Sequence, residues 1–197
     1  MDIGGAMLIL ASKSPRRREL LTMAGLAYEC IPSQVEEHVP AGTPAGQIPV
    51  ILSAQKAEDV FASHPDALVI GADTVVAVDD LVLGKPKDAA EAAAMLRTLS
   101  GKTHTVYTGV TLRDKNGTES FCSGSKVTFY ELTEQEIARY VETGEPMDKA
   151  GAYGIQGHGC ILVKHIEGDF FTIVGLPVAE TVRRVQRRAA ALEKDGE

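Results

Sequence analysis

The sequence has no tryptophan, only 5% aromatic residues and only three cysteines in 197 residues. Cys30, Cys122 and Cys160 are widely spaced and form no C-x-x-C pair, a pattern that argues against a disulfide framework and against a zinc site. We therefore expect three reduced, packed thiols in a cytoplasmic protein.

An excess of positive charge and a long apolar run are also missing. The 20 lysines and arginines stand against 27 acidic residues, for a net charge of −7, which argues against a nucleic-acid polymer as the main partner. No apolar run approaches the roughly 20 residues that cross a bilayer, and we expect residues 1–6 not to be a signal peptide. The length suits a single domain, residues 1–197, in which any phosphate recognition is local.

The patterns that are present predict a mixed α/β domain. Asp114 to Gly117 is typical of a hairpin turn, and Thr133 with Glu136 forms a capping box at a helix start. The last helix has four arginines mostly opposite its apolar stripe, and we interpret them as a solvated face. Strands are expected at 7–11, 28–31, 68–78, 105–112 and 119–129 and on both sides of 167–169; helices are expected at 15–24, 47–63, 88–99, after 133 and at 178–192.

Asp73 is the most informative single residue. It lies with Thr74 in the middle of the apolar strand 68–78, where an unpaired carboxylate costs several kcal/mol. Asp73 therefore needs a cation, a donor or a metal beside it. A structural role, such as capping a nearby loop, is the competing interpretation.

The segment from Ser12 to Arg18 is a candidate anion site, because a strand, a short loop and a helix start follow one another there. Its three consecutive arginines oppose the usual preference for acidic residues in a first helical turn. A bound polyanion such as a triphosphate would reverse that interaction. Three exposed side chains on a tolerant helix start are the alternative.

Two further segments are weaker candidates. The loop Gly84–Lys87 follows the strand of Asp73, so Lys85 could meet an anion there, although a solvated lysine fits equally. The glycine-rich stretch 148–159 suggests a loop that approaches something closely, and its Gln156 could offer a donor and an acceptor to a base. Lys56 is not distinguished by its position on a helical wheel.

Three other patterns do not indicate function. Ser100 to Thr103 resembles the end of a P-loop but runs from helix to strand, which is the wrong order. His158, Cys160 and His165 are close in sequence, yet the residues from Cys160 onward resemble a core strand rather than a zinc site. The sequence also has no G-x-S-x-G elbow of a serine hydrolase.

Together, these motifs closely resemble the Maf family of nucleoside triphosphate pyrophosphatases, from about residue 7 to about residue 185. The resemblance implies a mixed, elongated central sheet flanked by helices, with two lobes and a cleft, as in inosine triphosphate pyrophosphatases. The motifs are Leu10–Ser12 with Ser14–Arg17, Val35–Glu37, Lys56, Gly71–Thr74, Gly84–Pro86, Asp148–Gly157 and Val174–Pro177.

The resemblance also implies a reaction and a subgroup. Family members hydrolyse a nucleoside triphosphate to the monophosphate and pyrophosphate with a divalent metal such as Mg²⁺, Mn²⁺ or Co²⁺. Members with Arg16, Thr74 and Gln156 at these three positions act on dTTP and UTP. The sister group that prefers 7-methyl-GTP has tryptophan in place of Arg16.

The roles that the resemblance implies divide into catalysis and binding. Asp73 would be the proton acceptor or would hold the metal, and Glu37 would support the metal or the water. Lys56 and Lys85 are expected to assist catalysis by surrounding the triphosphate together with Ser12 and Arg17. The base would be recognised by Arg16, Thr74 and Gln156.

Other assignments stay open at this point. A nucleotide-binding regulator of cell division, in which hydrolysis is secondary, is the main alternative, although it would not need both Asp73 and Glu37. A kinase or ATPase would need the missing P-loop. The substrate is either ordinary dTTP and UTP or a modified pyrimidine nucleotide, and a homodimer is one alternative to a monomer.

Overall fold

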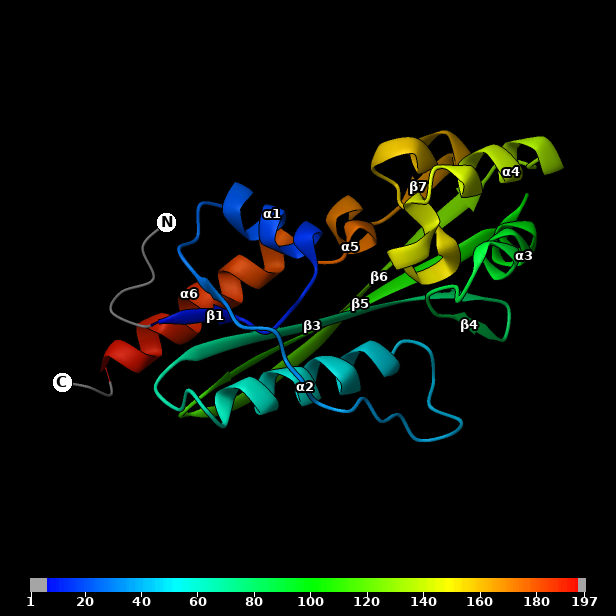
Figure 1. Ribbon diagram of the computed structural model, residues 1–197. Helices are drawn as coiled ribbons and strands as arrows, with labels where there is room; N and C mark the ends of the chain where they lie inside the picture. The colour runs from blue at the N-terminus through cyan, green and yellow to red at the C-terminus, as the bar shows by residue number, and fades with distance from the viewer. Residues whose placement is uncertain (1–6, 195–197) are drawn as a thin grey trace. The chain divides into compact units, whose positions relative to one another are not determined.

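The computed structural model describes residues 7–194, so the segment 1–6, for which no signal peptide was expected, lies outside the described residues. Helices, strands and three 3₁₀ turns alternate along the chain (Figure 1). The strands are β1 Leu8–Leu10, β2 Glu29–Cys30, β3 Leu68–Val78, β4 Leu81–Leu83, β5 Thr103–Asp114, β6 Gly117–Phe129 and β7 Val163–Glu167. The helices are α1 Pro15–Met23, α2 Ile48–Phe61, α3 Ala89–Leu99, α4 Glu134–Glu142, α5 Phe170–Val174 and α6 Val178–Lys194, and the 3₁₀ turns are η1 Glu145–Asp148, η2 Ala150–Ala152 and η3 Gly157–Leu162.

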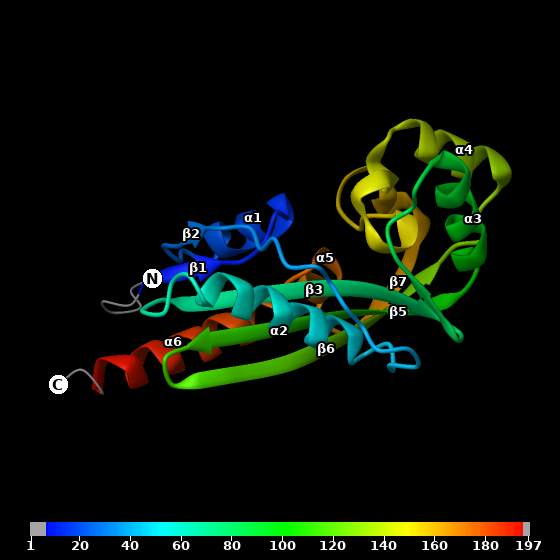
Figure 2. The same ribbon diagram turned by 60° about the horizontal axis from the view of Figure 1, so that its bottom comes forward.

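Within the described residues, one mixed sheet contains all seven strands, in the order β2-β1-β3-β5-β6-β7, with β4 paired to β3. β1 is parallel to both β2 and β3, whereas β3 with β4 and β6 with β7 are antiparallel. β3, β5 and β6 have 11, 12 and 13 residues, about twice the usual strand length, and run side by side in Figures 1 and 2. The predicted mixed sheet flanked by helices is confirmed.

The chain forms two compact units. Of the described residues, the first unit comprises 7–73, 108–123 and 175–194, and the second comprises 74–107 and 124–174. Each of the three long strands therefore contributes one segment to the first unit and one segment to the second. The last residue of β3 in the first unit is Asp73, and the next residue, Thr74, begins the second.

In the first unit, helix α2 covers a cluster of small and branched side chains on β1 and β3. Ile9 and Val69 are fully buried in this cluster, and Ala57 and Val60 contribute to it from α2. Because β1 and β3 are buried on both faces, they read in the sequence as nearly continuous apolar runs.

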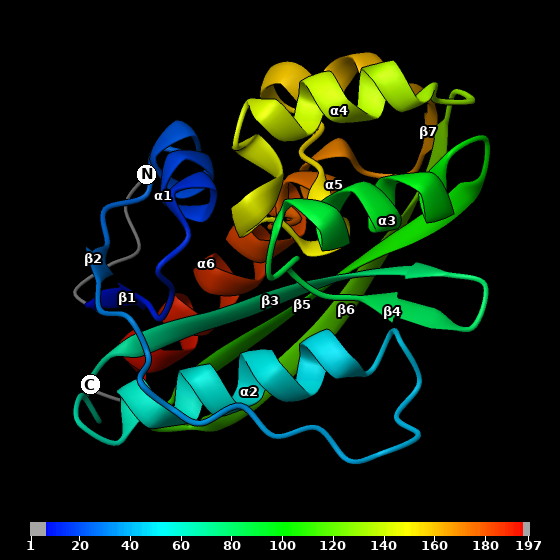
Figure 3. The same cartoon turned by 45° about the vertical axis from the view of Figure 1, so that its right-hand side comes forward.

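In the second unit, α3 and α4 begin at the residues that the sequence marks. The Asp88 carboxylate accepts the Glu91 N–H at 2.8 Å, and Thr133 and Glu136 form the predicted capping box. The two helices lie next to each other in Figure 3. They cover a core that includes Leu96 and Phe129.

Two predictions around Glu167–Asp169 are wrong. The residues after this turn form helix α5 rather than a strand, because the Asp169 carboxylate accepts the N–H groups of Phe171 and Thr172 at 3.3 and 2.9 Å and starts a helix. The residues from Cys160 onward were expected in a core strand, but the strand β7 begins only at Val163, and Cys160 lies in η3. The short strand β4 was not predicted; the loop predicted at Gly84–Lys87 begins directly after it.

The cysteines are not packed as expected. Cys30, Cys122 and Cys160 are all free and exposed. Cys30 lies on β2, at the end of the strand order, and Cys122 occupies an outward position of the alternating strand β6. Cysteine content alone does not tell which face of a strand a thiol occupies.

The arginines of α6 are not simply a solvated face. Arg188 makes a bidentate ion pair with Asp114, both contacts at 2.6 Å, and the Asp114 side chain is 2% exposed. Arg184 and Arg187 both pair with Glu119 on β6. The acidic partners come from the distant hairpin of β5 and β6, so the pattern within the helix could not reveal them.

Within residues 7–194, no helix is both long and apolar enough to span a membrane.

Candidate functional site

In the middle of β3, two consecutive residues, Asp73 and Thr74, are only partly buried. The flanking residues Ala72 and Val75 are 0% and 7% exposed, whereas the Asp73 side chain is 14% exposed. Side chains alternate along a strand, so Asp73 and Thr74 point to opposite faces of the sheet. Asp73 shares its face with Gly71.

Two glycines allow α2 to lie directly on the sheet in the first unit. A Cβ at Gly71 of β3 would lie 2.1 Å from the carbonyl oxygen of Ser53, and one at Gly109 of β5 would lie 2.4 Å from that of Pro49. No side chain fits in either place. The helix backbone therefore approaches the strands closely, and Lys56, which precedes the contact residue Ala57, is brought next to Asp73.

Lys56 joins two carboxylates. Its Nζ atom lies 2.5 Å from Oδ1 of Asp73 and 2.9 Å from Oε1 of Glu37. The Lys56 and Asp73 side chains are 16% and 14% exposed, while that of Glu37 is 49% exposed. The structure thus supplies the cation that a carboxylate in an apolar strand requires.

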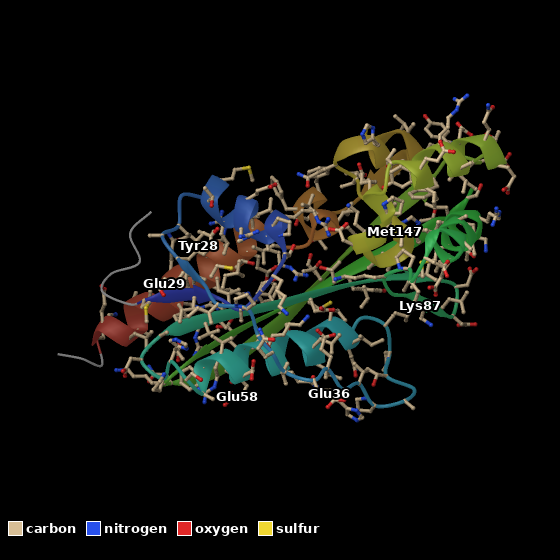
Figure 4. The ribbon with its side chains drawn as sticks, in the orientation of Figure 1. Tyr28, Glu29, Glu36, Glu58, Lys87 and Met147 are labelled. Carbon is tan, nitrogen blue, oxygen red and sulfur yellow. The ribbon has the colours of Figure 1, made fainter. Side chains whose placement is uncertain are left out.

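Glu37 belongs to an irregular segment between β2 and α2 that α2 itself holds in place (Figure 3). The Gln55 carboxamide accepts the N–H of His38 at 3.0 Å and donates to its carbonyl oxygen at 2.6 Å. One turn further along α2, the Asp59 carboxylate accepts the Ser33 hydroxyl and the Gln34 N–H, and these hydrogen bonds lower its pKa. In Figure 4 the neighbouring Glu36 lies beside α2.

Ser12 and Arg17 form a second polar cluster, at the point where β1 leads into α1. The Arg17 guanidinium donates to the Ser12 hydroxyl at 3.2 Å and to the Gly175 carbonyl oxygen at 2.8 Å. Ser12 and Arg17 are only 6% and 8% exposed, so these groups are fixed rather than freely solvated. Helix α1 is braced from outside by the Tyr28 hydroxyl, which donates to the Arg18 carbonyl oxygen (Figure 4).

The charges of these clusters influence one another. Burial lowers the pKa of the Arg17 guanidinium, while Asp73 and Glu37 oppose that shift and the half-buried Arg16 adds to it. Asp73 and Glu37 therefore lie within electrostatic range of Arg17 as well as in contact with Lys56. This combination of two carboxylates and fixed cations suits a ligand that is itself anionic and binds a metal.

The carboxylates also fit a divalent metal. Mg²⁺ is usually bound by one or two carboxylates together with phosphate oxygens and water. Glu37 and Asp73 already converge on one cationic centre, the Lys56 ammonium. Among residues 7–194 no group of three or more histidine, cysteine and acidic side chains forms a complete metal site, so the remaining ligands would come from substrate and water.

The remaining predicted residues, Thr74, Lys85 and Gln156, belong to the second unit. Lys85 is exposed on the loop before α3. That loop is tied to the glycine-rich stretch, because the N–H of Gly151 donates to the carbonyl oxygen of Gly84 at 3.0 Å. Gly151 has φ +69°, and a Cβ there would lie 3.0 Å from the Val76 side chain of β3, so both the backbone conformation and the tight contact favour a glycine.

Gln156 lies in the loop between η2 and η3 and is exposed. The side chains that hold this loop are Tyr140 and Glu145, which the sequence did not single out. Gln55, Asp59 and Gly71 were missed in the same way. A glycine in the middle of an apolar strand was the one available signal, since it often marks a close backbone approach.

Comparison with known proteins shows the family of the chain. The family profile described as "Maf-like protein" matches residues 7–188. The chain is 53% identical over 179 residues to a protein of Bacillus cytotoxicus named dTTP/UTP pyrophosphatase, covering 91% of this chain and 94% of that protein. It is 54% identical over 176 residues to a Bacillus pumilus protein of the same name, covering 89% and 93%. This chain belongs to the Maf family.

Proposed function

We propose that this protein hydrolyses dTTP and UTP to the nucleoside monophosphate and pyrophosphate. The observation that supports this most directly is the group formed by Asp73, Lys56 and Glu37 in the same unit as the buried Arg17. Relatives more than half identical over most of the chain are named dTTP/UTP pyrophosphatase. A regulator that only binds nucleotide would not need two carboxylates held around one lysine.

Hydrolysis at the α-phosphorus needs an attacking water and stabilisation of the charge that develops on pyrophosphate. Asp73 accepts a proton from that water, and Lys56 keeps the carboxylate in place. Ser12, Arg17 and Lys85 donate to phosphate oxygens. Because hydrogen bonds already fix the Arg17 side chain, little ordering entropy is lost when substrate binds.

A divalent metal would be held by Glu37 and Asp73. When bound, such a metal offsets phosphate charge and lowers the pKa of a coordinated water. The base is recognised by Arg16, Thr74 and Gln156. In the orientation in which the Gln156 carboxamide accepts the N3–H of uracil or thymine and donates to the neighbouring carbonyl oxygen, it does not match cytosine, whose N3 is an acceptor and whose 4-amino group is a donor.

The test is a panel of dTTP, UTP, CTP, dCTP, GTP and ATP with Mg²⁺, Mn²⁺ or Co²⁺, scored by chromatography of the products. We expect dTTP and UTP to be the best substrates and to yield monophosphate and pyrophosphate in equal amounts. Stepwise release of single phosphates would contradict the reaction. Equal turnover of all six nucleotides would contradict the base preference.

A further inference from the structure

The loop that presents Gln156 is anchored at its start by Tyr140 and at its end by Glu145. At its start, the N–H of Gly154 donates to the Tyr140 hydroxyl at 3.1 Å. At its end, the N–H groups of His158 and Gly159 donate to the two oxygens of Glu145 at 2.8 and 3.1 Å.

The two anchors are joined to each other. The Tyr140 hydroxyl donates to Oε1 of Glu145 at 2.9 Å, and Tyr140 is only 3% exposed. Although burial raises the pKa of Glu145, the His158 N–H, the Tyr140 hydroxyl and the Gly159 N–H together lower it. Three donors aimed at one carboxylate form a rigid, charge-assisted arrangement.

The glycines of the loop let it lie directly on these anchors. A Cβ at Gly157, where φ is +70°, would lie 2.6 Å from Oε2 of Glu145. A Cβ at Gly159 would lie 2.2 Å from the Gly154 carbonyl oxygen and 2.7 Å from the Tyr140 hydroxyl. Backbone and anchors therefore touch without any side chain between them.

Between the anchors, Gln156 is exposed, and the structure gives its carboxamide no hydrogen bond within residues 7–194. Its backbone is extended, with φ −88° and ψ 161°, and lies between Gly154 on one side and His158 and Gly159 on the other, whose N–H groups are held by Tyr140 and Glu145. The backbone on both sides of Gln156 is thus held by the buried Tyr140 and the partly buried Glu145, while the polar side chain of Gln156 is left available for a ligand.

We propose that Tyr140 and Glu145 are positioning residues for base recognition, which hold the loop 154–159 so that Gln156 can select uracil and thymine. This inference rests on the proposed function and deepens it. The pair acts through Gln156 and does not touch the reacting phosphates. Loss of the pair should therefore affect discrimination between bases more than the chemistry of hydrolysis.

The experiment compares Glu145→Gln and Tyr140→Phe with the unmodified protein. An amide nitrogen cannot accept a hydrogen bond, so Glu145→Gln loses at least one of the hydrogen bonds from the His158 and Gly159 N–H groups. Tyr140→Phe removes the hydroxyl that accepts the Gly154 N–H. We expect either change to lower the ratio of kcat/KM for dTTP to that for CTP about tenfold, mainly through a higher KM for dTTP. The smaller change, Tyr140→Phe, serves where Glu145→Gln fails to fold.

Two comparisons separate positioning from a general loss of stability. Thr133→Ala removes the cap of the same helix α4 without touching the loop, and it should lower Tm while leaving the dTTP to CTP ratio unchanged. In a Gln156→Ala background, Glu145→Gln should have no further effect on the ratio, because the residue through which it acts is gone.

The outcomes distinguish failure of the inference from failure of the proposed function. An unchanged ratio in both Tyr140→Phe and Glu145→Gln would overturn the inference while leaving the reaction intact. So would an equal fall in the ratio in Thr133→Ala, or a further fall in the Gln156→Ala background. Absence of pyrophosphate release by the unmodified protein would instead refute the proposed function, and the inference with it.

Discussion

Asp73 is surrounded by charges within the first unit. Lys56 contacts it directly, Glu37 shares that lysine, and Arg17 interacts with both carboxylates through space. Two cations and two anions nearly cancel, so the site carries little net charge before a ligand binds. A triphosphate with one divalent metal still carries net negative charge, and Arg16, whose charge also acts on Arg17, is a further cation that would offset it.

Replacing Asp73 with asparagine should separate binding from turnover. We expect Asp73→Asn to lower kcat by a factor of about 10²–10⁴, the usual contribution of a general base, because an amide cannot accept the proton of water. Binding of a non-hydrolysable dTTP analogue, measured by calorimetry, should change little. The control is Asp80→Asn, at an exposed position of the turn between β3 and β4. Full turnover in Asp73→Asn would eliminate it as the base.

His104 is the titratable residue with the clearest effect of burial. It is 2% exposed, its Nε2 lies 2.7 Å from the Tyr153 hydroxyl, and its Nδ1 has no hydrogen-bond partner within residues 7–194. The rings of Phe129 and Tyr153 pack edge-on against it. Burial lowers the pKa of His104 to about 4.

This shift predicts a loss of stability in acid. Between pH 6.5, the ordinary histidine pKa, and the folded pKa of about 4, the unfolded chain binds more protons than the folded chain. The free energy of unfolding therefore decreases as the pH is lowered through this range, by up to about 3 kcal/mol. Above that window the contribution is complete. Urea unfolding from pH 7.5 to 4.5 should show the stability gap between His104→Gln and the unmodified protein narrowing. For the control Phe129→Leu, the difference in unfolding free energy from the unmodified protein should not narrow in this way. A constant difference for His104→Gln would disprove the assignment of the acid-dependent loss of stability to His104.

The contact between α2 and the sheet decides where Lys56 lies. Gly71 leaves room for the helix backbone, and Gln55 and Asp59 on the same helix hold the segment that carries Glu37. Helix α2 thus positions Lys56 and Glu37, two of the three charged residues around Asp73. Any shift of α2 relative to β3 should alter activity as well as stability.

Gly71→Ala tests this dependence. The added Cβ would meet backbone atoms of Ser53 and Ala57, which cannot swing aside as a side chain would, so α2 must move. We expect a loss of about 1–3 kcal/mol in stability, typical of overpacking, and at least a tenfold fall in kcat. Gly84→Ala is the stability control, since its Cβ would meet nothing within 4 Å. Normal kcat in Gly71→Ala would show that the helix position is not critical.

Local signals explain why some elements were predicted and others were not. Asp88 and Thr133 cap their helices with their own neighbours, so a few residues of sequence are sufficient to locate α3 and α4. Helix α5 follows an equally good cap, Asp169, but its apolar residues also suit a strand. At a length of five residues, no periodicity distinguishes the two.

The three long strands each continue from one unit into the other, so the chain passes repeatedly between the two units. The first unit is built from three separate stretches of chain and the second from two, so neither can be released by cutting one linker. The prediction of a single domain over residues 1–197 remains to be tested by unfolding.

We expect one cooperative thermal transition, because unfolding either unit would break strands that continue into the other. Differential scanning calorimetry should give a calorimetric enthalpy close to the van 't Hoff enthalpy. Tryptophan is absent, so tyrosine fluorescence and far-UV circular dichroism serve as the second and third probes and should give coincident melting curves. Two separated transitions would show that the units fold independently.

The sequence by itself determined the fold class, the main helices and strands, and the family, since periodicity, caps and ordered motifs are local properties of the chain. It also indicated that Asp73 needs a partner, because burying a lone carboxylate is costly. Only the tertiary structure decided that the partner is Lys56, that Glu37 shares it, and that Tyr140 and Glu145 hold the loop of Gln156. These contacts join residues distant in sequence or depend on the space beside a glycine, and neither is encoded in a local pattern.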